Sequence, residues 1–130
     1  MENLWVLALD IGFRRSGVAV AQRLTGSGRP LTILRKPVET LTAADFAPFI
    51  RQWPVQRLLL GWPEHADGSP HPLHGHLQKL AGLLQEQFHL PVIFVNEYLT
   101  SHEAHHRLGQ KNNLDAMAAL IIAEDYLNSL

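Results

Sequence analysis

Three carboxylate residues occupy positions in the chain where an acidic side chain is unusual. Asp10 follows the apolar run of residues 4–9, and Glu97 comes shortly after the apolar run that ends at Val95. Asp115 directly precedes an alanine-rich apolar segment. Burial penalises the ionised form of a carboxylic acid, so an acid at the end of a buried element suggests a use for its charge. Three carboxylates that converge on one point would bind a divalent cation such as Mg²⁺, which prefers oxygen ligands.

Each acid also has a simple structural explanation. Asp10 could satisfy the backbone of a turn, and Glu97 could be an exposed loop charge. Asp115 could interact with a helix N-terminus that a preceding asparagine caps. Apolar residues follow Asp115 at helical spacing, however, so we expect its side chain to point inward rather than to solvent. A single acidic residue in such a position is common, but three in one chain favour a cation site.

The elements that must position these acids follow from the pattern of apolar residues. Residues 4–10 form a continuous apolar run, which is typical of a strand buried on both faces. Residues 16–23 and 31–36 predict two further strands, with a turn at 26–30 rich in glycine and proline. We expect these three strands to form a meander.

The rest of the chain predicts an alternation of helices and strands. Thr42 is a candidate N-cap for the first helix, and Pro54 lies beyond its end. The predicted elements are a helix at 42–53, a strand at 55–60, a loop at 61–72, a helix at 73–88, a strand at 91–95, and helices at 100–108 and 113–128. This order indicates one domain, residues 1–130, in which helices cover the faces of a mixed sheet.

Composition excludes several classes of protein. The chain has 130 residues, of which 46% are hydrophobic, and it contains no cysteine, so disulfides and thiolate sites are excluded. It has neither an apolar run of about 18 residues nor a signal peptide, so we expect a cytoplasmic protein. The net charge of −1 is not typical of a nucleic-acid binder. Residues 1–40 nevertheless carry six basic and three acidic side chains, an excess that could contact phosphates.

Several short motifs occur in an order and spacing known from one protein family. The first, roughly D-x-G-x-x-R-x-G-x-A, is formed by Asp10, Gly12, Arg15, Gly17 and Ala19. A loop motif, roughly G-x-P followed by D-G, is formed by Gly61, Pro63, Asp67 and Gly68. The last, roughly D-x-x-A-A, is formed by Asp115, Ala118 and Ala119. In these residues the chain resembles the YqgF/RuvX family, whose members are described as RuvC-like Holliday junction resolvases and as pre-16S rRNA nucleases.

The chain departs from the family pattern at a third motif. The usual D-E-R-x-T reads N-E-Y-L-T at residues 96–100, so Asn96 replaces an acid and Tyr98 replaces a basic residue. The change removes a pair that could orient Glu97, which could alter substrate choice or reduce the rate. Phe13 stands where the family usually has a small polar residue. Tyr98 or Phe13 could stack on an unpaired base, although a packing role is an equal alternative.

The resemblance implies an α/β, RNase H-like fold, with a five-stranded mixed sheet and helices on both faces. It also implies a metal-dependent endonuclease in which Asp10 bridges two Mg²⁺ or Mn²⁺ ions and Glu97 and Asp115 each complete one side. Its substrate would be branched DNA or the 5′ end of pre-16S rRNA, and a junction resolvase would be a homodimer. The candidate nucleic-acid contacts are Arg14, Arg15, Lys111 and Tyr98.

Three other functions compete with this interpretation. His102, Glu103 and His106 satisfy H-E-x-x-H, the pattern of a zinc hydrolase, but Thr100 and Glu103 also form a potential capping box. Asp10 followed by Gly12 also resembles the phosphate loop of actin-like proteins and sugar kinases, which need two such lobes. A non-catalytic nucleic-acid-binding module of the same fold is the third alternative.

Overall fold

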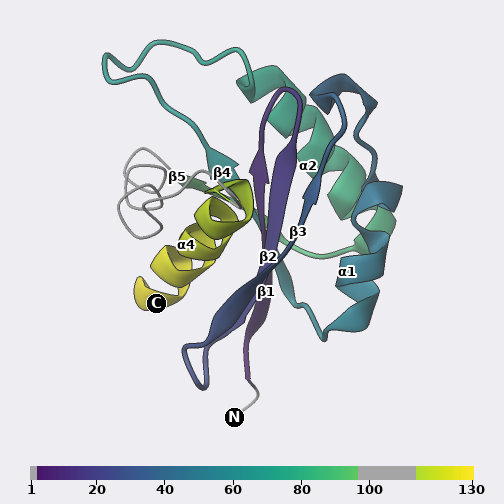
Figure 1. Cartoon of the computed structure of the whole chain (residues 1–130), viewed down its shortest axis with the longest axis vertical. Helices are drawn as coiled ribbons and strands as arrows, with labels where there is room; N and C mark the ends of the chain where they lie inside the picture. Colours follow the sequence, from purple (N-terminus) through teal and green to yellow (C-terminus); the bar gives the residue numbers. More distant parts are fainter. Residues whose placement is uncertain (1–2, 97–113) are drawn as a thin grey trace.

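A computed structural model of the chain describes residues 3–96 and 114–130, which form a five-stranded sheet with helices on both faces (Figure 1). The strand order across the sheet is β3-β2-β1-β4-β5. The strands are β1 (Trp5–Ile11), β2 (Ser16–Gln22), β3 (Gly28–Leu34), β4 (Arg57–Trp62) and β5 (Val92–Asn96). Among these strands β2 alone runs antiparallel to the others, so the carboxyl ends of β1, β3, β4 and β5 meet at one edge of the sheet, here called the carboxyl edge.

The predicted meander of β1, β2 and β3 is confirmed, but β3 begins earlier than expected. The strand starts at Gly28 and includes Pro30, which pairs with Ala19 of β2. Proline is tolerated here because β3 lies at the edge of the sheet and needs no N–H donor on its outer side. The register of the β2–β3 pair shifts between Val18 and Ala19, which accommodates the irregularity.

The helix predicted at 42–53 is broken into shorter pieces. Two 3₁₀ turns, η1 (Val38–Thr40) and η2 (Ala43–Asp45), precede a short helix, α1 (Ala47–Gln52). Pro48 explains the break, because proline has no N–H to bond to a preceding turn and is accepted only in the first turn of a helix. The helix predicted at 42–53 was therefore wrong in its extent.

The N-cap expected at Thr42 caps η2 instead of a long helix. The backbone N–H of Thr42 donates to Oδ2 of Asp45 at 2.8 Å, and the Lys36 ammonium contacts both carboxylate oxygens of Asp45 at 2.9 and 3.0 Å. Partial burial acts to raise the pKa of the Asp45 carboxyl, but Lys36 and Thr42 outweigh it and leave that pKa below its ordinary value. The ion pair of Lys36 with Asp45 and the hydrogen bond of Thr42 to Asp45 fix the connection between β3 and α1.

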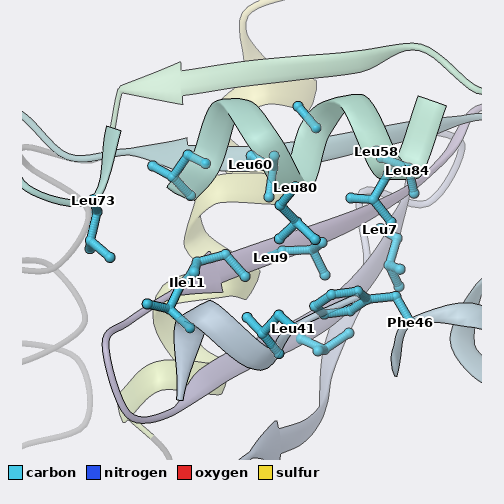
Figure 2. Packing of buried hydrophobic residues seen from close by; sticks show 14 of the residues in the cluster. Leu7, Leu9, Ile11, Leu41, Phe46, Leu58, Leu60, Leu73, Leu80 and Leu84 are labelled. Atoms are coloured by element: carbon cyan, nitrogen blue, oxygen red, sulfur yellow. The ribbon is translucent and has the colours of Figure 1, made fainter. Parts of the chain in front are cut away.

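The two faces of the sheet are covered by different helices. On one face α2 (His74–Phe88) packs through Leu77, Leu80 and Leu84 on the odd-numbered residues of β1 and the even-numbered residues of β4, and Phe46 completes this core (Figure 2). On the other face α4 (Leu114–Asn128) packs on the even-numbered residues of β1. No helix in the described part of the chain is long and apolar enough to cross a membrane.

Small residues bring α4 close to the sheet. Ala119 and Ala123 are fully buried against the strands. At Gly28 of β3 an added Cβ would lie only 2.7 Å from Cδ1 of Leu120, so the helix backbone and the strand approach more closely than larger side chains would allow.

The direction of α4 is fixed at both of its ends (Figure 1). Near its C-terminus the hydroxyl of Tyr126 accepts a hydrogen bond of 2.6 Å from the guanidinium of Arg57, the first residue of β4. Near its N-terminus Ala116 lines the same hollow as Thr32 and Ile33, in the second half of β3, and Arg35, just beyond that strand. The helix therefore runs antiparallel to β1, and its first turn reaches the carboxyl edge.

Candidate active site

Asp10 is the penultimate residue of β1 and lies on the face of the sheet that α4 covers. Its orientation follows from strand alternation, because Val6 and Ala8 of the same strand pack against α4. The residue is half-buried, and the position opposite it on β2 is Gly17, which presents no side chain. Asp10 thus lies near the end of a largely buried strand, at the carboxyl edge, as the sequence predicted.

The backbone of α4 brings a second predicted carboxylate residue to the same place. Asp115 is the second residue of α4, and the first turn of that helix reaches the carboxyl edge on the face where Asp10 lies. The structure therefore brings the positions of Asp10 and Asp115 to one end of one face. The other predicted site residues, Glu97, Tyr98 and Lys111, lie outside the described residues, and so does the H-E-x-x-H motif of residues 102–106.

The chemistry of this end of the sheet fits a hard divalent cation. Carboxylate oxygens are the ligands that Mg²⁺ and Mn²⁺ prefer, and a half-buried Asp10 beside the first turn of a helix that carries Asp115 offers two such groups. Within residues 3–96 and 114–130 no group of three or more histidine, cysteine or acidic side chains could hold a metal ion. The third carboxylate predicted from the sequence is Glu97, which follows the last residue of β5 and lies outside the described residues.

The turn after β1 presents two cations next to Asp10. The N–H of Gly12 donates to the buried Oγ of Ser16 at 3.3 Å, and an added Cβ at Gly12 would lie 2.6 Å from the carbonyl oxygen of Arg15. This close approach requires glycine. The tight turn leaves Arg14 and Arg15 exposed, within five residues of Asp10, where guanidinium groups can contact phosphate.

A cavity lies between β3 and the first turn of α4. Its volume is about 410 Å³. It is lined by Pro30, Leu31, Thr32, Ile33, Arg35 and Ala116. Arg35 is exposed there and adds a third cation near the carboxyl edge, which the sequence analysis did not assign to the site. Its place just after an edge strand was the only signal that could have identified it.

Aromatic and histidine rings gather on the opposite, α2-covered side of the carboxyl edge. We call this group the ring array. It consists of Phe13, Trp62, His65, His71, His74 and Phe94. At its centre the rings of Trp62 and His74 lie almost parallel, 9° apart, with centroids 3.9 Å apart. Trp62 also contacts Phe94 at a centroid distance of 4.7 Å and a tilt of 59°.

Two hydrogen bonds fix the imidazole of His74. Its Nδ1 accepts from the backbone N–H of His71 at 3.3 Å, and its Nε2 lies 2.6 Å from the carbonyl oxygen of Pro63. Because a carbonyl can only accept, Nε2 carries the proton and donates it, and the ring is held as the neutral tautomer. Since both ring nitrogens are used, His74 is not available as a metal ligand.

His71 connects the centre of the array to the turn after β1. Its ring lies 5.8 Å from that of His74, 5.0 Å from that of His65 and 6.5 Å from that of Phe13, and its Nδ1 accepts from the N–H of Leu73 at 3.0 Å. Burial lowers the pKa of His71, and the neighbouring imidazole of His65 lowers that pKa further. The ring is therefore uncharged at neutral pH.

Comparison with known proteins identifies the family. The family model described as "RuvX: Holliday junction resolvase" matches residues 4–129. The chain belongs to the RuvX family. A RuvX relative from Polynucleobacter necessarius, named "Putative pre-16S rRNA nuclease", is 34% identical over 124 residues, which cover 95% of this chain and 84% of the relative. A relative of the same name from Bordetella pertussis is 32% identical over 130 residues, which cover 100% of this chain and 98% of the relative.

Solved structures confirm the RNase H-like fold that the motifs predicted. RuvC of T. thermophilus, in complex with a Holliday junction substrate, superposes with a TM-score of 0.60 at 13% identity, over 97% of this chain and 96% of that one. The Holliday junction resolvase of fowlpox virus superposes with a TM-score of 0.59 at 14% identity, over 98% of this chain and 100% of that one. At these identities the likeness concerns the fold alone.

Proposed function

We propose that this RuvX family member is a divalent-metal-dependent endonuclease that hydrolyses phosphodiester bonds in structured nucleic acid at the carboxyl edge of its sheet. The observation that carries the proposal is the antiparallel packing of α4 on β1, which takes the position of Asp115 to the end of the sheet where Asp10 lies. The family match over residues 4–129 supports the same activity.

The proposed roles follow from the chemistry of each side chain. Asp10, Glu97 and Asp115 would hold two Mg²⁺ or Mn²⁺ ions. Such ions, when bound, lower the pKa of water and stabilise charge on the leaving oxygen. Arg14 and Arg15, exposed in the turn that follows Asp10, would bind the phosphates that flank the cut.

Two further residues complete the proposed site, and Arg35 extends it. Lys111 would neutralise the charge that develops on the phosphate, and Tyr98 would contact the nucleic acid. Arg35, exposed at the cavity beside α4, would bind a phosphate farther along the strand.

We propose the 5′ end of pre-16S rRNA as the substrate, with the four-way DNA junction as its competitor. The relatives from Polynucleobacter necessarius and Bordetella pertussis, which carry the pre-16S name, are 34% and 32% identical over nearly the whole chain. The junction-binding structures share 13–14% identity. A four-way junction needs two symmetric cuts and hence a two-fold homodimer, whereas a precursor with one cut needs no second copy.

The test is cleavage of labelled substrates by the purified protein in Mg²⁺, Mn²⁺ or EDTA. A structured RNA precursor, a four-way DNA junction and linear duplex DNA are compared side by side. We expect metal-dependent cutting of the RNA precursor above the other two. Paired symmetric nicks on the junction alone, together with a dimer in sedimentation, would instead establish a resolvase.

Two matched variants test the role of Asp10. Asp10→Asn keeps the shape of the side chain and removes its charge, and we expect the rate to fall roughly a thousandfold, because bound metal supplies several kcal/mol of transition-state stabilisation. Asp67→Asn is the control, since Asp67 is exposed and its Oδ1 accepts from the N–H of Ser69 within a turn. Full metal-dependent activity of a folded Asp10→Asn protein would end the proposal.

A further inference from the structure

The ring array exposes large apolar surface at both of its ends. Phe13 is 49% exposed in the turn after β1, and Phe94 is 41% exposed on β5. Trp62, His71 and His74 lie half-buried between them. Among the described residues only four large hydrophobic side chains are exposed, and two of these belong to the array. The array therefore presents aromatic surface to solvent at the same edge of the sheet as Asp10.

The spacing of the rings leaves Phe13, at one end of the array, open to a planar ligand. Phe13 and His71 are within 19° of parallel, but their centroids are 6.5 Å apart, compared with 3.9 Å for Trp62 and His74. Phe13 therefore lacks the close ring contact of the central pair, and its exposed ring can stack on another planar group.

The central rings are held in place before any ligand arrives. The two hydrogen bonds of His74 fix its orientation, and its contact with Trp62 fixes that of the indole. His71 is fixed by its bond to the N–H of Leu73. A preorganised surface loses little conformational entropy when a ligand binds, which favours affinity.

The position of the array suits a nucleic-acid strand that passes Asp10. Trp62 ends β4, the strand that pairs with β1 at Leu9 and Leu60, so the array begins on the strand next to that of Asp10 and on the opposite face. Arg14 and Arg15 follow Phe13 directly in the turn and are exposed. Rings for bases and guanidinium groups for phosphates therefore lie side by side, which is the combination that single-strand binders use.

We propose that the ring array stacks on unpaired bases of the substrate, so that the enzyme selects nucleic acid with a single-stranded segment beside the cut. This inference rests on the proposed nuclease function and narrows its substrate class. The bases of a continuous duplex are already stacked on one another, and they cannot offer their faces to Phe13 or Phe94. Since every base has an aromatic face, we expect little sequence preference.

Binding measured in EDTA tests the proposal without any cutting. The probes are a blunt duplex and the same duplex with a ten-nucleotide single-stranded tail, each made as RNA and as DNA. We expect the protein to prefer the tailed probe, and we expect the Phe13→Ala/Phe94→Ala variant to lose about 5- to 150-fold in affinity for each base that it no longer stacks. Its affinity for the blunt duplex should change less than about twofold, because phosphate contacts supply that binding.

Two control variants separate stacking from general damage. Phe13→Tyr/Phe94→Tyr keeps both rings and should retain the preference for the tail. Leu24→Ala removes a side chain that is 80% exposed in the turn between β2 and β3, at the opposite edge of the sheet, and should bind as the wild type does. A tail preference confined to RNA or to DNA supports the array and identifies the strand that it takes.

Two results would overturn the inference. One is an equal loss of affinity for blunt and tailed probes in the alanine variant, and the other is no loss for either. Neither result concerns cleavage at the site of Asp10. A protein that cuts normally, but whose binding affinity does not depend on the rings, therefore refutes the stacking role and leaves the nuclease proposal intact.

Discussion

A methyl group added at Gly28 should loosen the packing of α4 on the sheet. The Cβ of Gly28→Ala would lie 2.7 Å from Cδ1 of Leu120, 2.8 Å from Cβ of Ala21 and 2.8 Å from the carbonyl oxygen of Val20. The leucine methyl can rotate away, but the other two atoms belong to or are fixed by the backbone of β2. β3 must therefore shift relative to β2, and this shift disturbs its contact with Leu120 of α4.

The expected loss in the free energy of unfolding of Gly28→Ala can be estimated from two opposing effects. Overpacking of this kind costs about 1–3 kcal/mol. Replacing glycine by alanine also stabilises the folded state by about 0.4–1 kcal/mol, because it restricts the conformations of the unfolded chain. The free energy of unfolding should thus fall by about 1–2 kcal/mol. For 130 residues the entropy of unfolding is about 0.27 kcal/mol/K, so Tm should fall by about 4–8 °C.

The assay is thermal and urea unfolding followed by circular dichroism, with Gly82→Ala as the control. Gly82 is exposed within α2 and has no atom within 4 Å of an added Cβ, so alanine there should stabilise the protein by about 0.5–1 kcal/mol. A Gly28→Ala protein as stable as the wild type would refute the close approach of α4 to β3. Since α4 carries Asp115, we also expect the destabilised variant to lose metal-dependent cleavage before it loses secondary structure on heating.

Three further changes test the turn after β1, the β3–α1 connection and the core. Gly12→Ala should cost about 1–3 kcal/mol and reduce cleavage, because the new Cβ would lie 2.6 Å from the carbonyl oxygen of Arg15; unchanged urea midpoint and rate would contradict this. The lowered pKa of Asp45 means that its ion pair with Lys36 stabilises the fold above the ordinary value of 3.8 and is lost as pH falls below it. Asp45→Asn should therefore lower the free energy of unfolding by about 1 kcal/mol at pH 6, and its difference from the wild type should shrink as pH falls below 3.8; parallel pH curves would argue against this. Phe46→Ala, at a fully buried position, should lower the urea-derived free energy by about 3–5 kcal/mol, and a loss below about 1 kcal/mol would show that the core closes around the gap.

The sequence predicted those parts of the molecule that depend on local pattern. The meander, the long helices and the placement of Asp10 at a strand end all follow from apolar periodicity, which reports burial directly. The break near Pro48 was missed because the helix was predicted from its boundary signals, Thr42 and Pro54, without weighing the proline inside it. The early start of β3 was missed because Pro30 was taken as part of a turn, although an edge strand tolerates it.

The candidate site was predictable only in part. The position of Asp115 at the end of the sheet where Asp10 lies depends on the direction of α4. The apolar spacing after Asp115 predicted only which face of the helix packs inward. The ring array could not be predicted, because its members come from the turn after β1, the end of β4, the start of α2 and the middle of β5. No periodicity connects such residues, and only the order of strands in the sheet brings them together.

The packing of the last helix on the first strand has a consequence for when the enzyme can act. Asp10 and Asp115 are separated by almost the whole chain, and α4 is synthesised after every strand of the sheet. Contacts between distant parts of a chain form late, because closing a long loop costs entropy before the contacts repay it. Under the proposed function, a nascent or truncated chain that lacks α4 also lacks Asp115, and we expect it to cut nucleic acid only after α4 has been made and has packed on the sheet.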